Sequence, residues 1–186
     1  LRSTKIEGYC SAQSVRPGED LQVMVSVSPP VPVLLEVFRM GYYKGLGARL
    51  VETIGPFDAA TQPTPDAGER GVRACGWLPS ASIMVTEHWV SGVYIGRLST
   101  RPASSTTVAS WQSYVIFIVT DDEPADVLFQ CSDNTWQAYN GWPEADSLYT
   151  QGRNGTSLHD DYGVSFDRPY GRQAQFESVV CDPLSV

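Results

Sequence analysis

Two tyrosines carry the chemistry that is easiest to recognise in this sequence. Tyr139 lies in the stretch NTWQAYNGW, directly after the strand-like run VLFQC, and Tyr170 lies in VSFDRPYG, after a second such run. A phenolate oxygen is a hard metal ligand, but a phenol with a pKa of about 10 ionises at neutral pH only beside a strong Lewis acid such as ferric iron. Tyrosines next to tryptophans more often pack and hydrogen-bond. Metal ligation by these two residues is therefore a hypothesis that competes with a structural role.

Other sequence patterns give weaker evidence for catalytic residues. The sequence contains no GxSxG elbow, no HExxH motif and no phosphate-binding glycine loop. His88 precedes a turn and is expected to be exposed, whereas His159 is followed by Asp160 and Asp161, which could orient or charge it. Cys131 follows a strand-like run, where nucleophiles often sit, but no base is near it in the sequence. A disulfide or a buried thiol is the better interpretation of Cys131.

The four cysteines are Cys10, Cys75, Cys131 and Cys181. They lie far apart with no CxxC or Cys/His spacing, which argues against a zinc site. An even number of cysteines predicts two disulfides, with three connectivities open. Asn154 begins an Asn-Gly-Thr sequon in a polar stretch, so it is a candidate glycosylation site. Together these features predict a secreted or otherwise extracytoplasmic protein.

Charge and hydropathy exclude several classes of partner. The formal net charge is −8 and the sequence pI is about 4.6, with no cluster of Lys and Arg, so nucleic acid and anionic membranes are not expected partners. No apolar run reaches the roughly 18 residues of a membrane span. The chain begins at Leu1 without Met or a signal-peptide pattern, from which we expect a processed or truncated N-terminus.

The first part of the chain reads as short strands separated by Pro/Gly turns. In Asp20–Ser28, Leu21, Val23, Val25 and Val27 alternate with polar residues and Met24, which predicts a half-buried antiparallel strand. The seven predicted strands are Lys5–Ala12, Asp20–Ser28, Val33–Met40, Arg49–Ile54, Ser82–Thr86, Gly92–Ser99 and Trp111–Thr120. Residues 1–121 are therefore predicted to form a mainly β, seven-stranded β-sandwich of immunoglobulin or fibronectin type. Residues 55–76 carry no strand signal and are predicted to be a long loop.

The character of the sequence changes at Asp121-Asp122-Glu123-Pro124. This acidic tetrapeptide is predicted to be a linker, since contiguous carboxylates lack the ligand spread of a calcium loop. Residues 114–119 are apolar on both faces, as expected if the last sandwich strand leans on a second domain. Strands are predicted at Ala125–Gln130 and at Tyr162–Phe166. Residues 122–186 hold too little regular structure to close a core and are expected to begin a larger domain.

Six separated phrases together resemble one known family. They are KIEGYCSAQSVRPGE at 5–19, VFRMGYYKGLGARLV at 37–51, WVSGVYIGRLS at 89–99, SYVIFIVTDD at 113–122, ADVLFQCSDNTWQAYNGW at 125–142 and VSFDRPYG at 164–171. In this order they resemble the large (catalytic) subunit of N,N-dimethylformamidase and the wider family named after it. The resemblance implies an immunoglobulin-like β-domain followed by an α/β domain like that of class I glutamine amidotransferases, of which 122–186 would be an incomplete part.

The resemblance also implies an activity. The family's characterised member is an amidohydrolase that cleaves a small tertiary amide to formate and dimethylamine, with a mononuclear iron held by two tyrosines and a glutamate. The implied tyrosine ligands are Tyr139 in TWQAYN and Tyr170 in SFDRPY, with Tyr149 and Tyr162 as nearby alternatives. Iron would act as a Lewis acid on the amide oxygen and on a bound water. The implied surrounding or pocket residues are Trp136, Asn140, Asp167 and Arg168, although Arg168 could equally be a structural ion-pair partner.

The sequence departs from the family at the third ligand. The family's glutamate lies in a later motif of the type HDEYW, and neither Glu144 nor Glu177 lies in such a motif. We therefore expect another chain, or a further C-terminal segment, to complete the α/β domain and its site. The alternative hypothesis is a non-catalytic docking module in which the aromatic segment with Trp136 and Trp142 packs on another chain.

Overall fold

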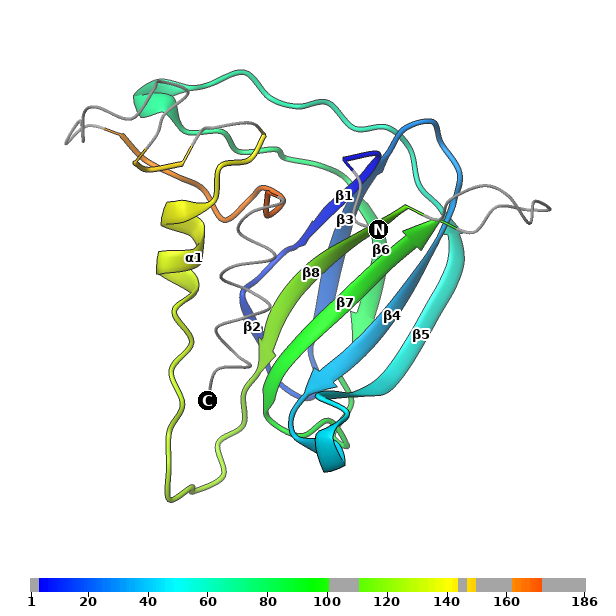
Figure 1. Cartoon of the computed structure of the whole chain (residues 1–186), viewed down its shortest axis with the longest axis vertical. Helices are drawn as coiled ribbons and strands as arrows, with labels where there is room; N and C mark the ends of the chain where they lie inside the picture. The colour runs from blue at the N-terminus through cyan, green and yellow to red at the C-terminus, as the bar shows by residue number, and fades with distance from the viewer. Residues whose placement is uncertain (1–3, 101–110, 144–146, 150–161, 172–186) are drawn as a thin grey trace.

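The computed structural model describes residues 4–100, 111–143, 147–149 and 162–171, and in these ranges it is mainly β. The strands lie in two sheets, one ordered β1-β3-β6 and the other β2-β8-β7-β4-β5 (Figure 1). The strands are β1 (Ile6–Cys10), β2 (Ser14–Val15), β3 (Asp20–Val27), β4 (Pro32–Met40), β5 (Ala48–Asp58), β6 (Pro79–Met84), β7 (Gly92–Thr100) and β8 (Gln112–Val119). The helical elements are the 3-10 turns η1 (Tyr43–Gly45) and η2 (Glu69–Gly71) and the α-helix α1 (Asp133–Tyr139).

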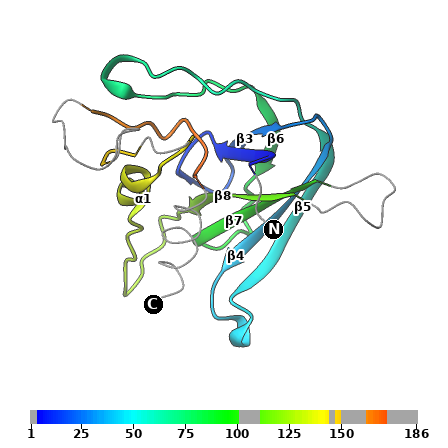
Figure 2. The same cartoon turned by 45° about the horizontal axis from the view of Figure 1, so that its top comes forward.

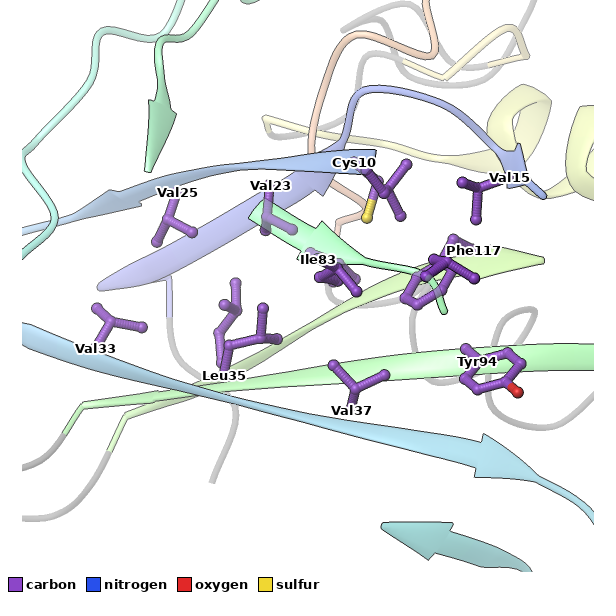
Figure 3. Close-up of a cluster of buried hydrophobic side chains, with 14 of the residues drawn as sticks. Cys10, Val15, Val23, Val25, Val33, Leu35, Val37, Ile83, Tyr94 and Phe117 are labelled. Atoms are coloured by element: carbon purple, nitrogen blue, oxygen red, sulfur yellow. The ribbon is translucent and has the colours of Figure 1, made fainter. Parts of the chain in front are cut away.

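One hydrophobic core joins the two sheets. Val23 and Val25 of β3 and Ile83 of β6 contribute from the three-stranded sheet, while Leu35 of β4 and Phe117 of β8 contribute from the five-stranded sheet (Figure 3). All five side chains are essentially inaccessible to solvent. Alternating apolar residues thus bury one face of each sheet against the other, as the period of two predicts.

All seven predicted strands are present, with ends that differ by up to four residues, so the prediction of a mainly β fold is confirmed. The sequence analysis missed β2. This strand has two residues and pairs in parallel with β8, Ser14 opposite Ile118 and Val15 opposite Val119. Two residues are too few to show any alternation of apolar and polar side chains, so no periodic signal existed to find it.

The expectation that β3 is half-buried is wrong, because its second face is covered as well. Met24 packs there with Tyr9, Trp77 and Trp142. Beside it, Ser26 Oγ accepts a hydrogen bond of 2.9 Å from the Gln62 backbone N–H. The loop predicted at residues 55–76 supplies much of this cover. It is shorter than predicted, because β5 continues to Asp58. The remaining residues 59–76 therefore cover the three-stranded sheet, and we call them the lid.

β8 is buried on both sides, as predicted for its apolar run. Val115 and Phe117 face the core between the sheets, whereas Ile116 points the other way. Ile116 packs there against Trp136 and Tyr170, which come from beyond the acidic linker. The contact explains why both faces of this strand are apolar.

Two predicted strands after the linker are not present. Residues 125–130 and 162–166 are irregular, and Val127, Leu128 and Phe129 are 81%, 93% and 57% exposed. Among the described residues, no hydrogen bond involves residues 124–131. A strand exists only when a neighbour satisfies its backbone groups, and the described part of the chain offers this segment no such neighbour.

The stretch NTWQAYNGW shows no helical or alternating apolar period, yet its first six residues belong to helix α1. The helix has seven residues, and it buries Trp136 and Gln137. Figure 2 shows that α1 lies beside the two sheets rather than between them. A helix of two turns presents too few residues for an apolar stripe to be recognised. No helix in the described ranges is long and apolar enough to cross a membrane.

The shared core predicts how strongly single side chains affect stability. Replacing Leu35, which is fully buried, with alanine should lower the free energy of unfolding by about 2–5 kcal/mol, because a cavity replaces core contacts. Leu46→Ala is the matched control, since that leucine is 81% exposed and should change stability by less than about 0.5 kcal/mol. Urea denaturation measures both variants, and equal effects would contradict the assignment of Leu35 to the core.

Candidate functional site around helix α1

The C-terminal end of α1 is held by Arg168. Its Nη2 donates to the carbonyl oxygens of Gln137 at 3.2 Å and Asn140 at 3.0 Å, and its Nη1 donates to that of Trp142 at 3.0 Å. The last carbonyls of a helix have no partner within it, and a planar guanidinium presents several donors in a fixed geometry. Arg168 is 1% exposed, so these bonds form away from water.

Asn140 joins α1 to the segment that contains Tyr170. Its Nδ2 donates to Gln137 Oε1 at 2.7 Å and to the Pro169 carbonyl at 2.9 Å. Its Oδ1 accepts from the backbone N–H groups of Gly171 at 2.7 Å and Trp142 at 3.2 Å. Asn140 is completely buried and all four contacts are made, which gives α1 and residues 168–171 a fixed relation. We call Arg168, Gln137 and Asn140 the buried polar network.

Two donors in this region have no acceptor among the described residues. Gln137 Oε1 accepts from both Asn140 Nδ2 and Arg168 Nε, which fixes the orientation of the amide. Its Nε2 and the Trp142 indole Nε1 are then buried without a hydrogen-bond partner in the described ranges. Buried donors of this kind are uncommon and costly.

Tyr170 lies in the apolar cluster on the outer side of β8. It is 5% exposed and packs with Ile116 and Trp136. Burial raises the pKa of its phenol, and Asp133 raises it further, while Arg168 acts in the opposite direction. Without a metal the hydroxyl is therefore protonated at neutral pH.

Tyr139 has different surroundings. It is 59% exposed, and its ring centroid lies 4.6 Å from that of Tyr149, with the two planes inclined by 39°. Tyr149 is 40% exposed, and Tyr162 is partly buried. The structure thus places one predicted ligand in a buried cluster and the other in an exposed aromatic pair. The segments that carry the two residues are adjacent, because the buried polar network connects them.

Asp167 ties the same region to the lid over β3. Its Oδ2 accepts from the Gly76 N–H at 2.9 Å, and its backbone carbonyl accepts from the Cys75 N–H at 2.7 Å. The Asp167 carboxylate also acts on Tyr9 of β1, since burial raises the pKa of the Tyr9 phenol and Asp167 raises it further. Trp77 donates its backbone N–H to the Tyr9 hydroxyl at 3.1 Å. Asp167 therefore links residues 162–171 to Cys75 and Gly76 of the lid.

The structure places the predicted pocket residues Trp136, Asn140, Asp167 and Arg168 in one region, and three further residues that were not predicted also lie there. Gln137 lies in the same amide-rich run as Asn140, and that run was the signal for it. Tyr9 and Trp77 lie far away in the sequence, and no local pattern points to them. Arg168 organises the helix end by donating to backbone carbonyls, and the ion pair considered for it stays a prediction.

The prediction of two disulfides is wrong, because Cys10, Cys75 and Cys131 are free thiols and Cys181 lies outside the described residues. Burial raises the pKa of Cys10 to about 12. Burial, assisted by Asp167, raises that of Cys75 to about 12 as well. Burial also raises the pKa of Cys131, which opposes formation of the thiolate that a nucleophile needs.

Several other predicted features can now be placed. His88 is exposed, as expected. Within the described ranges, no three His, Cys, Asp or Glu side chains come together in a way that could hold a metal ion. Outside those ranges lie Glu144, Asn154, His159 and Glu177.

The alternative hypothesis of an aromatic anchor for another chain is wrong in its original form. Trp136 and Trp142 are 3% and 1% exposed and are buried within this chain. Trp142 packs edge-on against Trp77, with ring centroids 6.1 Å apart and an interplanar angle of 86°. Side chains covered in this way have no surface to offer a partner.

The contacts of Arg168 predict a local effect on helix α1. Arg168→Met should raise the rate of amide exchange in residues 133–142 at least about tenfold, because buried carbonyls lose their donors, while exchange in β3 and β4 stays unchanged. The control is Arg97→Met, which breaks the partly exposed pair with Glu36 and should leave α1 unaffected. Hydrogen exchange followed by mass spectrometry decides between these outcomes, and equal protection of α1 in both variants would refute the role of Arg168.

The raised thiol pKa values predict slow alkylation. With a pKa of about 12, Cys10 and Cys75 should be thiolate in only about one molecule per thousand at pH 9, where an ordinary exposed cysteine is mostly ionised. Iodoacetamide should therefore modify both residues far more slowly in the native chain than in urea, with the native rate rising as the pH approaches 12. Peptide mass spectrometry measures this, and rapid native labelling at pH 8 would contradict it.

Comparisons with known proteins complete the description of this region. Residues 34–182 match the family model described as "N,N-dimethylformamidase beta subunit-like, C-terminal". No curated protein matches the chain. Among solved structures, the superoxide reductase (neelaredoxin) from Ignicoccus hospitalis is 14% identical, covering 61% of this chain and 79% of that one, with a TM-score of 0.29. A likeness at that level carries no argument. The family match spans most of the sequence, including both segments of the buried polar network, and the chain therefore belongs to the N,N-dimethylformamidase beta subunit-like family.

Proposed function

We propose that this chain is part of a formamidase-like hydrolase that acts on a small non-peptide amide. The observation that carries this proposal is the match of residues 34–182 to the dimethylformamidase-related family. The six phrases that resemble the family's large subunit extend from residue 5 to residue 171, so both ends of the described region support it.

For the fold, we propose that residues 1–121 are an immunoglobulin-like sandwich and that residues 122–186 begin an α/β domain of the class I glutamine amidotransferase type. Two sheets around one core support the first part. The second part is supported by residues 124–130, which are exposed and make no hydrogen bond among the described residues, and which contain the apolar run Val127, Leu128 and Phe129. A strand that is apolar on both faces is typical of the interior of a parallel sheet.

We propose further that a second polypeptide, or a further segment, supplies the neighbours of that strand. Val127, Leu128 and Phe129 would then be covered on both sides. The family description names a subunit, which agrees with an assembly of several chains. Export and glycosylation at Asn154 stay predictions, which intact-mass analysis of the native protein would check.

The proposed cofactor is iron, with Tyr139 and Tyr170 as ligands. Phenolate oxygens suit a ferric ion, and the Tyr170 side chain is buried. Two buried donors in the same region, Gln137 Nε2 and Trp142 Nε1, have no acceptor among the described residues. The fit is partial, because Tyr139 is paired with Tyr149 and the described residues contain no cluster of His, Cys, Asp or Glu that could add ligands. A further ligand would have to come from outside the described residues. When bound, iron would supply Lewis-acid polarisation of an amide carbonyl.

In this proposal the chain's own residues act by positioning. Arg168 and Asn140 fix residues 168–171 relative to α1, so the position of Tyr170 depends on the same bonds that close the helix. Trp136 and Ile116 exclude water from one side of the Tyr170 ring. A rigid support of this kind is what a ligand or a substrate-contacting group requires.

The proposal predicts a loss of iron from conservative variants. In the protein purified together with any accompanying chains, Tyr170→Phe should lower the iron content by at least about tenfold, and hydrolysis of dimethylformamide or another small amide should fall with it. Phenylalanine preserves the packing on Trp136, so stability should change by no more than about 1 kcal/mol. Elemental analysis and an assay of released amine are the measurements, and Tyr139→Phe should behave in the same way.

Tyr149→Phe is the matched control, because it changes a phenol beside Tyr139 that the proposal does not use. A preparation without iron, or an iron content that survives both Tyr139→Phe and Tyr170→Phe, would refute the ligand assignment. If Tyr149→Phe alone removed the metal, Tyr149 would take the place of Tyr139. Complete iron loading without hydrolysis of any small amide would instead refute the proposed activity.

A further inference from the structure

The turn between β4 and β5 presents apolar side chains to solvent on a fixed support. Tyr42 and Leu46 are 82% and 81% exposed. Beneath them, Arg39 Nη1 donates to the Tyr43 hydroxyl at 2.7 Å, and Arg39 Nη2 donates to the Ser91 carbonyl at 2.7 Å. The Arg49 guanidinium lies 5.4 Å from the centre of the Tyr43 ring. We call residues 41–50 the hairpin tip.

The backbone of the hairpin tip is strained. Tyr43 and Lys44 have φ values of 38° and 59°, in the left-handed region that side chains other than glycine seldom adopt. Such conformations are costly and often occur at functional sites. Tyr42, Lys44 and Leu46 are exposed around this strained turn.

The hairpin tip is also a basic island in an acidic protein. Residues 37–51 contain Arg39, Lys44 and Arg49 and no Asp or Glu, whereas the whole chain has 21 acidic and 13 basic residues. The charged residues in this range are therefore all basic. The combination fits a partner that is acidic and has some apolar surface.

The acidic linker, residues 121–124, combines negative charge with some apolar surface. Residues 121–124 are exposed, and Asp122 forms an exposed ion pair with Arg16 at 3.0 Å. The other two carboxylates, Asp121 and Glu123, have no ion-pair partner among the described residues. Pro124 follows them and offers a ring on which an aromatic side chain can pack.

We propose that the hairpin tip docks on the acidic linker of a second copy of this chain. Lys44 faces Asp121 and Glu123 of the other copy, while Tyr42 and Leu46 pack against its Pro124. Figure 1 shows the hairpin tip and the linker at the same end of the molecule, and Figure 2 agrees. A two-fold axis at this end therefore allows each copy to contribute both surfaces at once. An anionic membrane is disfavoured as the occupant, because the acidic linker at the same end of the molecule would repel it.

Sedimentation velocity of the 186-residue chain from about 1 to 100 µM tests the proposal. The wild type should self-associate, more weakly at about 1 M salt, since screening reduces the attraction of exposed charges. The double variant Tyr42→Ser/Leu46→Ser should weaken association at least tenfold. Leu78→Ser is the matched control, because Leu78 is 76% exposed and lies outside both surfaces.

Charge reversal makes the test specific. Lys44→Glu alone and Glu123→Lys alone should each weaken association, and the combination of the two should restore it. A chain that remains monomeric throughout, or one whose association is unaffected by the hairpin-tip variants, overturns the proposal. Cosedimentation of the wild type, but not of Lys44→Glu, with phosphatidylserine vesicles would overturn it in favour of a membrane. None of these outcomes depends on iron or on amide hydrolysis.

Discussion

The buried guanidinium of Arg168 is the interaction on which the region outside the two sheets depends. Removing an ionised group from water is costly, and here three backbone carbonyls and one amide oxygen compensate that cost. Those carbonyls lie at the end of α1, a helix of seven residues that could not persist by its own hydrogen bonds. The helix therefore exists because a residue about thirty positions later satisfies its end. The positions of the candidate residues on α1 and in residues 168–171 therefore depend on the contacts of Arg168.

The environment of the two tyrosines shows what the chain contributes by itself. Tyr170 is desolvated and fixed, which is the preparation that a ligand needs, whereas Tyr139 lies at the surface beside Tyr149. A phenol whose pKa is raised by burial gives up its proton only when a strong positive charge arrives. The family membership supports the proposed amide hydrolysis, and the chain's own contacts fix the position of Tyr170.

The sequence was sufficient for features that depend on local periodicity. Leu21, Val23, Val25 and Val27 alternate with their neighbours, and the strand β3 that holds them is found where the alternation predicts it. It was insufficient where a distant partner decides the outcome. Residues 125–130 have the composition of a strand but no neighbour to pair with, and α1 forms because of Arg168. The candidate residues Asn140, Asp167 and Arg168 were found by resemblance, while their contacts with Gln137 and Tyr9 came only from the structure.

The contacts that hold α1 and residues 162–171 have a consequence for the chain as a whole. Ile116 on β8 and Gly76 in the lid contact this region, and Tyr9 on β1 lies in one apolar cluster with Trp142. The covalent connection through residues 123–130 contributes none of these contacts. Two pieces separated by a cut in that connection would therefore remain associated, and they could be produced as separate polypeptides that reassemble.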